Sequence, residues 1–375
     1  MHGADSRRFR PTTAPLRILP AVSGLPAPAV LAVFAAAALA VWFAGIRLSN
    51  TTDVLADRLG LGEALGGLIL LAIATNLPEI AITVSAALAD NLGIAIGNIL
   101  GGIAIQTVVL ALIDALGLGR DDSLTYRSAS LSLVLEATLV IAVLVITVMG
   151  AQLPSSSNPG RFEPAALLIV SAWVAGLWLV ARSRTGLPWH ELGNAPGGQE
   201  RRRGHARAAR AKRVQKRLSL RAAAAVFAAG AVVTLVAGVV LERSGEVLAG
   251  RAGMSGVVFG ATFLAAATAL PEISTGLSSL RLGDYQLAVS DIFGGNAFLP
   301  VLFLPAGLIA GHAVLPQARA TDIYLTGLGA LLTAVYIVGL IFRPRRQLWV
   351  MGADSWAVVV LYALGVAGLI AIARG

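Results

Sequence analysis

Ten long apolar stretches follow one another along this chain of 375 residues. A helix needs about 20 apolar residues to cross a bilayer. Only 13% of the residues are charged, about half the share in a typical soluble domain. Strands of a membrane barrel would alternate over about ten residues, which these stretches do not. The sequence therefore predicts an all-α integral membrane protein whose ten transmembrane helices lie at 29–46, 65–88, 92–116, 129–149, 165–181, 222–241, 255–280, 287–310, 323–342 and 356–373.

The connections between these stretches divide the chain into four parts. We expect an N-terminal tail over 1–28, a first five-helix half over 29–181, a basic loop over 182–221 and a second five-helix half over 222–375. Arg7 and Arg8 before an alanine-rich run would also suit a signal peptide. A retained first helix is favoured, because cleavage would spoil the internal symmetry described below.

The distribution of Lys and Arg indicates an orientation. One side of the ten spans carries 20 of these residues and the side with both termini carries 9. By the positive-inside rule the first side is cytoplasmic, so both termini are expected outside the cytoplasm and the protein in the plasma or inner membrane. The loop 182–221 holds 12 of the basic residues, which suits a solvated loop or contact with anionic lipids. No motif for nucleic-acid binding accompanies this charge.

The sequence repeats itself at an offset of 193 residues, the separation of Ile103 and Asn296. Between Leu71 and Ala104, 14 of 34 positions are identical to the segment from Leu264 to Ala297 without a gap. Both copies, placed at 70–106 and 263–299, contain Ala-Thr-x-Leu-Pro-Glu-Ile and a later Gly-Gly. The second copy begins five expected spans after the first, so it enters the membrane from the opposite side. Two inverted-topology five-helix repeats are an architecture of secondary transporters with alternating access.

Each copy carries a glutamate inside an apolar span. Glu79 and Glu272 would cost several kcal/mol there without a compensating partner. Thr75 and Asn76 share a helical face with Glu79, and Thr268 repeats this arrangement beside Glu272. Proline before each glutamate frees a carbonyl from the helix. Carboxylate, hydroxyl, amide and carbonyl oxygens are the ligands of Ca²⁺, Mg²⁺ or Na⁺.

A second polar position follows each glutamate at the same spacing, at Asn98 and Asp291. Asn98 and Gln106 lie on one helical face with Gly102 between them, so a partner helix can approach closely. Asp291 and Gly295 repeat this spacing. Direct binding and helix packing are both open roles for these glycines.

All charges expected inside the spans are acidic. Acids such as Glu79, Glu136, Glu272 and Asp291 have no base beside them inside the spans. They must be protonated, hydrated or bound to cations, which indicates a cation pathway. Glu136 lies outside the repeat, where a structural hydrogen-bonded carboxyl is favoured over transport. The chain has no cysteine, and its four histidines are scattered, so we expect no cofactor beyond the transported cations.

At these positions the chain resembles the sodium/calcium exchanger family of the cation/calcium exchanger superfamily. Its alpha repeats of the form Gly-Thr-Ser-x-Pro-Glu compare with the segments 74–79 and 267–272 here. The resemblance implies that Glu79 and Glu272 are the central cation ligands. It further implies hydroxyl ligands at Thr75 and Thr268, carbonyl ligands at Ala72 and Ala265, and an amide at Asn296.

The chain departs from the family pattern at several positions. Asn76 and Ala269 replace the serines that follow threonine, and Gly102 and Gly295 replace those of the Gly-Ser-Asn stretch. A polar position further on is Gln106 in the first copy and leucine in the second. These changes alter the sites that would hold sodium in the family.

The leading hypothesis is a secondary antiporter that exchanges Ca²⁺ or a related cation against Na⁺ or H⁺. A cation channel is the nearest alternative, since acidic rings also select cations. A non-transporting membrane sensor or scaffold is a second. An intramembrane enzyme is disfavoured, because no buried histidine, serine–lysine pair or nucleotide-binding loop accompanies the acids.

Overall fold

Helices make up nearly all of the regular structure in the computed structural model of this protein. It describes residues 22–58, 67–118, 122–154, 158, 161–183, 219–254, 256–281 and 283–374. The expected tail before residue 22 and the basic loop from 184 to 218 lie outside these ranges. Eight helices of the described part are long and apolar enough to cross a membrane, namely Ala27–Thr52, Leu92–Gly117, Leu131–Ala151, Pro164–Ser183, Leu220–Arg251, Tyr285–Ala310, Ala320–Phe342 and Ala353–Arg374. The chain is thus a multi-pass membrane protein.

The two remaining expected spans are interrupted. In the first copy of the repeat α2 (Gly67–Thr75) ends just before α3 (Leu77–Leu88) begins. In the second copy α10 (Gly256–Phe259), the π-helix η4 (Gly260–Leu264) and α11 (Ala265–Thr268) lead to a break before α12 (Leu270–Arg281). Pro78 and Pro271, directly after the breaks, have no N–H for the preceding turn. Both breaks therefore lie shortly before a repeated glutamate.

Two buried helices form the centre of the bundle. α4 (Leu92–Gly117) is followed along the chain by the short α5 (Leu124–Ser128). α13 (Tyr285–Phe298) passes into the 3-10 turn η5 (Leu299–Leu302) and α14 (Phe303–Ala310). The expected continuous span over 287–310 is distorted at Pro300, which removes one backbone donor. α4 contacts α3, α12 and α13, so both copies of the repeat meet on it.

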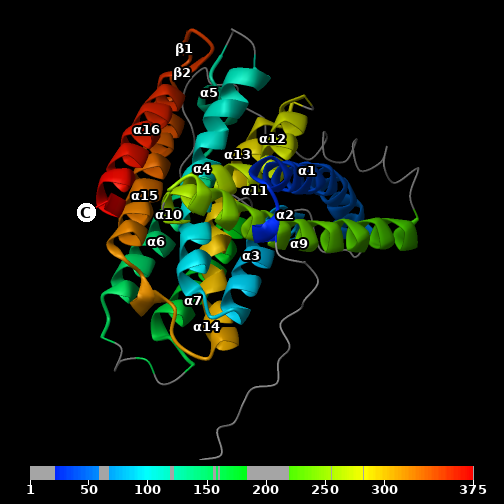
Figure 1. Cartoon of the computed structure of the whole chain (residues 1–375). Helices are drawn as coiled ribbons and strands as arrows, with labels where there is room; N and C mark the ends of the chain where they lie inside the picture. Colours follow the sequence, from blue (N-terminus) through cyan, green and yellow to red (C-terminus); the bar gives the residue numbers. More distant parts are fainter. Residues whose placement is uncertain are drawn as a thin grey trace, which may run out of the picture.

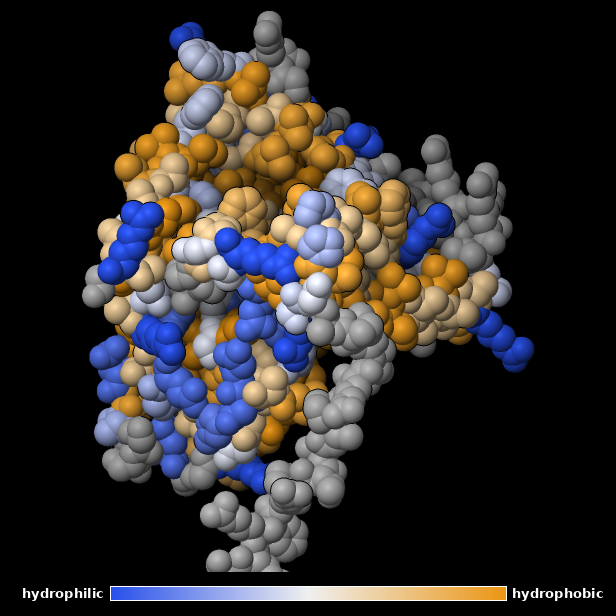
Figure 2. Space-filling view, viewed as in Figure 1, coloured by the Kyte–Doolittle hydropathy of each residue, from blue (hydrophilic) through white to orange (hydrophobic). Residues whose placement is uncertain are grey.

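A pair of long helices lies across the other elements. α1 (Ala27–Arg58) and α9 (Leu220–Arg251) run side by side and cross the remaining helices steeply (Figure 1). Gly45 of α1 packs against Pro271, and Gly238 of α9 lies 3.1 Å from the Pro78 carbonyl, measured from the position of an added Cβ. Each glycine thus lets its helix approach one break of the repeat. Hydrophobic residues cover the region over this pair and the upper part of the same face (Figure 2).

The remaining helices surround the centre. They are η1 (Val22–Gly24), α6 (Leu131–Ala151), α7 (Pro164–Ser183), η6 (Leu315–Gln317), α15 (Ala320–Phe342) and α16 (Ala353–Arg374). The strands β1 (Gln347–Leu348) and β2 (Met351–Gly352) form an antiparallel hairpin between α15 and α16. Glu163, before α7, accepts the backbone N–H groups of Val314 and Leu315 at 3.0 Å. Burial raises the pKa of this carboxyl, and the two N–H groups partly offset that effect.

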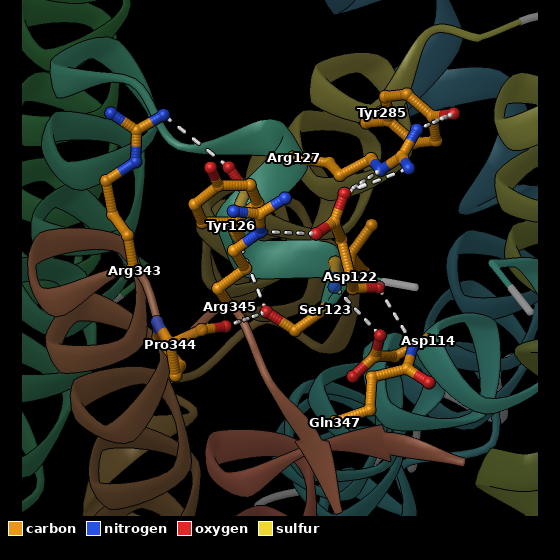
Figure 3. A network of polar contacts seen from close by, with 11 residues as sticks. Asp114, Asp122, Ser123, Tyr126, Arg127, Tyr285, Arg343, Pro344, Arg345 and Gln347 are labelled. Carbon is orange, nitrogen blue, oxygen red and sulfur yellow. Dashed lines mark hydrogen bonds and ion pairs between the residues drawn. The ribbon is translucent and has the colours of Figure 1, made fainter. Parts of the chain in front are cut away.

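A polar network holds one end of the bundle together (Figure 3). Arg127 of α5 pairs with Asp122 at 2.9 Å and donates to the Tyr285 hydroxyl at the start of α13. Asp122 also accepts from Arg345 in the connection after α15 at 3.2 Å. Beneath these groups the buried Asp114 at the end of α4 accepts the N–H groups of Leu124 and Gly352. The network joins elements that lie far apart in the sequence.

Candidate cation-binding site

The two repeated glutamates meet at the centre of the bundle. Glu79 lies in the first turn of α3 and Glu272 in the first turn of α12, and they are 0% and 1% exposed. The charges of Glu79, Glu272 and Asp291 lie close enough to interact. The Thr268 hydroxyl of the second repeat is adjacent to the Glu79 carboxyl of the first. Polar groups of both repeats therefore lie together at the centre, and their role as cation ligands stays a prediction.

Amide side chains from α4 and α13 complete this group. Asn98 donates to the backbone carbonyl of Glu79 at 3.3 Å, which fixes α4 against α3. Gln106 donates to the Glu79 Oε1 and to the Asn76 Oδ1, both at 3.3 Å. Asn296 of α13 reaches across to the Ile103 carbonyl at 3.4 Å. All four amide residues are at most 2% exposed.

Several oxygens in this centre accept no hydrogen bond from any described residue. They belong to both repeats and include both carboxyl oxygens of Glu272 but only one of Glu79. Among them are Glu79 Oε2, Glu272 Oε1 and Oε2, Asn98 Oδ1, Gln106 Oε1, Asn296 Oδ1 and Ser290 Oγ. Buried oxygens without donors are costly unless a cation, a proton or water binds them. No salt bridge within the described ranges reaches either glutamate.

The backbone carbonyls of Ala72 and Ala265, which the family resemblance assigns as ligands, accept hydrogen bonds from different kinds of donor. The Ala72 carbonyl accepts the Asn76 side-chain amide at 2.7 Å as well as the Asn76 backbone N–H at 3.2 Å. The Ala265 carbonyl accepts the Thr268 hydroxyl at 3.1 Å and the backbone N–H of Ala269 at 3.0 Å. Their assignment as ligands stays a prediction, and in the first repeat a ligand would have to compete with an amide.

The glycines that replace family serines make room for neighbouring side chains. A Cβ on Gly295 would lie 2.8 Å from the Asn76 Nδ2 and 3.6 Å from the Gln106 Oε1. A Cβ on Gly102 would lie 3.4 Å from a methyl group of Leu299. The departures from the family pattern therefore occur in pairs. Gly295 makes room for Asn76, which replaces a serine of the other repeat, and Gly102 makes room for Leu299 of the other repeat.

We expect Gly295→Ala to reduce cation uptake by about tenfold. The new methyl group would displace Asn76 and break its bond to the Ala72 carbonyl, a loss of about 1 kcal/mol before any strain is counted. Gly294→Ala is the matched control, since a Cβ there meets nothing within 4 Å. Uptake by the two variants in proteoliposomes would be compared, and equal rates would contradict this account of Gly295.

Two polar side chains at the centre were not selected from the sequence. Ser290 precedes Asp291 and is 0% exposed, while the Thr107 hydroxyl accepts from Asn296 at 3.1 Å. Ser290 lies in the second copy opposite Gly97, and Thr107 lies just beyond the first copy, so no repeated polar residue marked either position. Glu136 is buried on α6 and lines a small cavity together with Ala72 and Ser290. A structural role for Glu136 stays a prediction.

The described residues contain no group of three or more His, Cys, Asp or Glu side chains close enough to hold a metal. Any cation in this centre would therefore need amide, hydroxyl or carbonyl oxygens besides the carboxylates. Such a mixed set binds hard cations and leaves them able to dissociate.

The model of the sodium/calcium exchanger protein family matches residues 29–181 and 222–371. The chain belongs to the sodium/calcium exchanger family. Family membership makes it a secondary cation antiporter, as expected from the intramembrane acids. Both matched segments include one copy of the repeat and exclude the basic loop between them.

Individual proteins and structures support this placement. The chain is 27% identical to the inner membrane protein YrbG of Escherichia coli K12 over 296 residues, which are 76% of this chain and 81% of YrbG. It is 26% identical to the putative antiporter CaxA of Alkalimonas amylolytica over 78% of this chain and 84% of CaxA. Its fold resembles the H⁺/Ca²⁺ exchanger CAX, with a TM-score of 0.63, 13% identity and coverage of 92% and 86%. The sodium–calcium exchanger NCX_Mj gives a TM-score of 0.57 at 17% identity, covering 91% and 99%.

Proposed function

We propose that this antiporter exchanges Ca²⁺ or a related cation against Na⁺ or H⁺ at a single centre formed by Glu79 and Glu272. The observation that carries the proposal is the meeting of two buried carboxyl groups from the two repeats, with three of their four oxygens accepting no hydrogen bond from the described residues. A divalent cation between them would balance both charges. Asp291 and the oxygens of Asn98 and Asn296 surround the same centre.

We further propose a fold of ten transmembrane helices in two inverted five-helix repeats. The interrupted helices α2–α3 and α10–α12 supply the two spans beyond the eight uninterrupted ones. Contacts between equivalent positions support this symmetry: Asn296 bonds to Ile103, its equivalent at the offset of 193 residues. Gly45 and Gly238, which are separated by the same offset, contact the prolines of opposite repeats. Both patterns are expected for halves related by a twofold axis in the membrane.

Alternating access follows from this arrangement. The α1–α9 pair touches both helix breaks through Gly45 and Gly238, where the absence of a side chain allows close approach. Movement of this pair relative to α4 and α13 would open the centre to one side at a time. Occupation of the carboxyl groups by a cation lowers the cost of burying them, so the loaded protein can change its open side while the empty one resists it.

The direct test is flux into proteoliposomes with controlled gradients. We expect ⁴⁵Ca²⁺ uptake that is saturable and driven by an opposing gradient of Na⁺ or H⁺. Replacing Na⁺ by choline at constant pH, and separately collapsing the pH gradient, identifies the counter-ion. An uptake rate that is the same with and without the Na⁺ and H⁺ gradients would contradict the exchange mechanism. A rate that does not saturate with Ca²⁺ concentration would favour a channel.

The topology is also a proposal. We propose that both termini lie outside the cytoplasm of a plasma or inner membrane, and that the loop 182–221 is cytoplasmic, where it is solvated or in contact with anionic lipids. The uneven count of basic residues supports this orientation. Labelling of single cysteines introduced into the cysteine-free chain, in intact and permeabilised cells, reports the side on which each end lies.

A further inference from the structure

The β-hairpin between α15 and α16 exposes apolar side chains at its tip. Trp349 and Val350 join β1 to β2, and both are exposed, as is Leu348 before them. The hairpin lies at the outer end of the two helices (Figure 1). Because both helices are long and apolar enough to span a membrane, a short connection between them lies at the depth of the lipid headgroups.

Trp349 has a backbone conformation that a large side chain disfavours. Its φ of 66° lies in the left-handed region, which bulky residues rarely adopt, and a hairpin turn with positive φ at its first central position usually has glycine there. The ring meets the Trp356 ring edge-on at a centroid distance of 6.0 Å, yet Trp349 remains 85% exposed. Contacts within the protein therefore do not explain the tryptophan, and a strained, exposed aromatic residue indicates a binding surface.

The connection from 343 to 352 contains three arginines and no acid. Arg343 and Arg345 lie against the Tyr126 ring, and Arg345 also pairs with Asp122. Arg346, next to the hairpin, is exposed. An arginine beside an apolar tip complements the phosphate of an anionic lipid whose acyl chains lie beneath it. A soluble anion would satisfy the arginine alone, so the combination of charge and apolar surface favours a phospholipid.

The hairpin is continuous with lipid-facing surface and is fixed to the bundle. Val338 and Phe342, in the last turns of α15 before the hairpin, are exposed apolar residues of a membrane-spanning helix. The Trp356 indole of α16 donates to the Leu348 carbonyl at 2.8 Å, which holds the tip against that helix. A ligand bound at the tip is therefore bound to the bundle, and it stabilises the folded protein.

We propose that the hairpin 347–352 is a lipid-binding anchor. Leu348 and Trp349 enter the boundary between headgroups and acyl chains, where tryptophan is enriched in membrane proteins. Arg346 binds the phosphate of an anionic phospholipid. This surface is separate from the cation centre, so the inference does not depend on the proposed function.

A nitroxide label measures the depth of the hairpin, because the chain has no cysteine of its own. The label is attached to Val350→Cys in bilayers of phosphatidylcholine and phosphatidylglycerol, with Val338→Cys as the lipid reference and Gln317→Cys, on an exposed turn, as the water reference. We expect the label at 350 to collide more with oxygen than with a water-soluble nickel complex, as at 338. Adding Trp349→Gly, which suits the backbone of the turn, should shift the ratio toward the value at 317.

Two results of this measurement would overturn the anchor. One is a label at 350 that matches the water reference while Trp349 is present. The other is a label shielded from both reagents, which would mean that a second copy of the chain or another protein covers the tip. Thermal unfolding shows whether each labelled variant is folded.

The headgroup contact is tested by thermal unfolding in nanodiscs with and without phosphatidylglycerol. Arg346→Gln should lose about 2 °C of the stabilisation that this lipid gives the natural protein, and Arg346→Lys should keep it. Arg374→Gln, exposed at the other end of α16, is the matched control for loss of charge. Equal stabilisation of Arg346→Gln and the natural protein would overturn the contact. So would an equal effect of soluble glycerol phosphate, because a free anion would then be sufficient.

Discussion

Replacing Glu272 by glutamine is expected to reduce ⁴⁵Ca²⁺ uptake into proteoliposomes by about a hundredfold or more. Both oxygens of this side chain lack hydrogen-bond donors among the described residues, so the carboxylate depends on a bound cation or proton. Glutamine keeps the size and removes the charge. Breaking a buried ion pair by removing one partner costs about 3 to 5 kcal/mol, which corresponds to at least about a hundredfold in affinity.

The corresponding change at Glu79 should have a smaller effect on affinity. Gln106 already donates to one oxygen of Glu79, so its carboxylate is less dependent on the cation. Glu246→Gln is the matched control, because Glu246 lies on the exposed side of α9. Thermal stability of each variant without Ca²⁺ shows whether it is folded. Uptake by a folded Glu272→Gln variant within threefold of the natural rate would contradict the assignment of the site.

The second large effect is expected at Asp114, near the end of α4. Its carboxyl group is 0% exposed and accepts three hydrogen bonds, from the N–H groups of Leu124 and Gly352 and from the Ser355 hydroxyl, at 2.7 to 2.8 Å. Asp114→Leu leaves all three donors buried without an acceptor. Each lost bond to a charged group is worth about 1.5 to 3 kcal/mol, so we expect a loss of about 4 kcal/mol or more.

Thermal unfolding in detergent should show this loss as a midpoint lowered by about 8 °C or more. Asp114→Asn, which keeps one acceptor oxygen, should lie between the natural protein and Asp114→Leu. Asp122→Asn is a comparison at the outer part of the same network, where the side chain is 14% exposed, and its effect should be smaller. Equal midpoints for the Asp114 and Asp122 variants would contradict the central role of Asp114 in this network.

The helix breaks could be predicted from the amino-acid sequence alone. Pro78 and Pro271 mark both breaks, because proline lacks the N–H that the preceding turn needs whatever surrounds it. The repeated Pro-Glu pair also showed that each half of the chain carries a carboxylate inside an apolar span. The distortion at Pro300 was missed in the expected span 287–310, since the apolar pattern continues through it.

The polar network around Asp114 shows the limit of such inference. Asp114 was part of an apolar stretch with no repeated equivalent, and its partner Gly352 lies 238 residues away. No periodicity links residues that are joined only by the packing of α4 against α16. Ser290 and Thr107 were likewise not predicted from the sequence, because their place at the centre depends on the packing of α4 against α13.

The sequence by itself determined that the chain lies in a membrane, that it is duplicated and that acids are buried in both copies, since these follow from hydropathy and from local residue spacing. Only the tertiary structure decided which oxygens of the centre remain available to a cation. Gln106 lies on α4, Asn76 at the break between α2 and α3, and Gly295 on α13, and the contacts among them depend on how closely these elements approach. Such distances are set by the packing of the whole bundle, so two equivalent glutamates in the sequence become unequal in the folded protein.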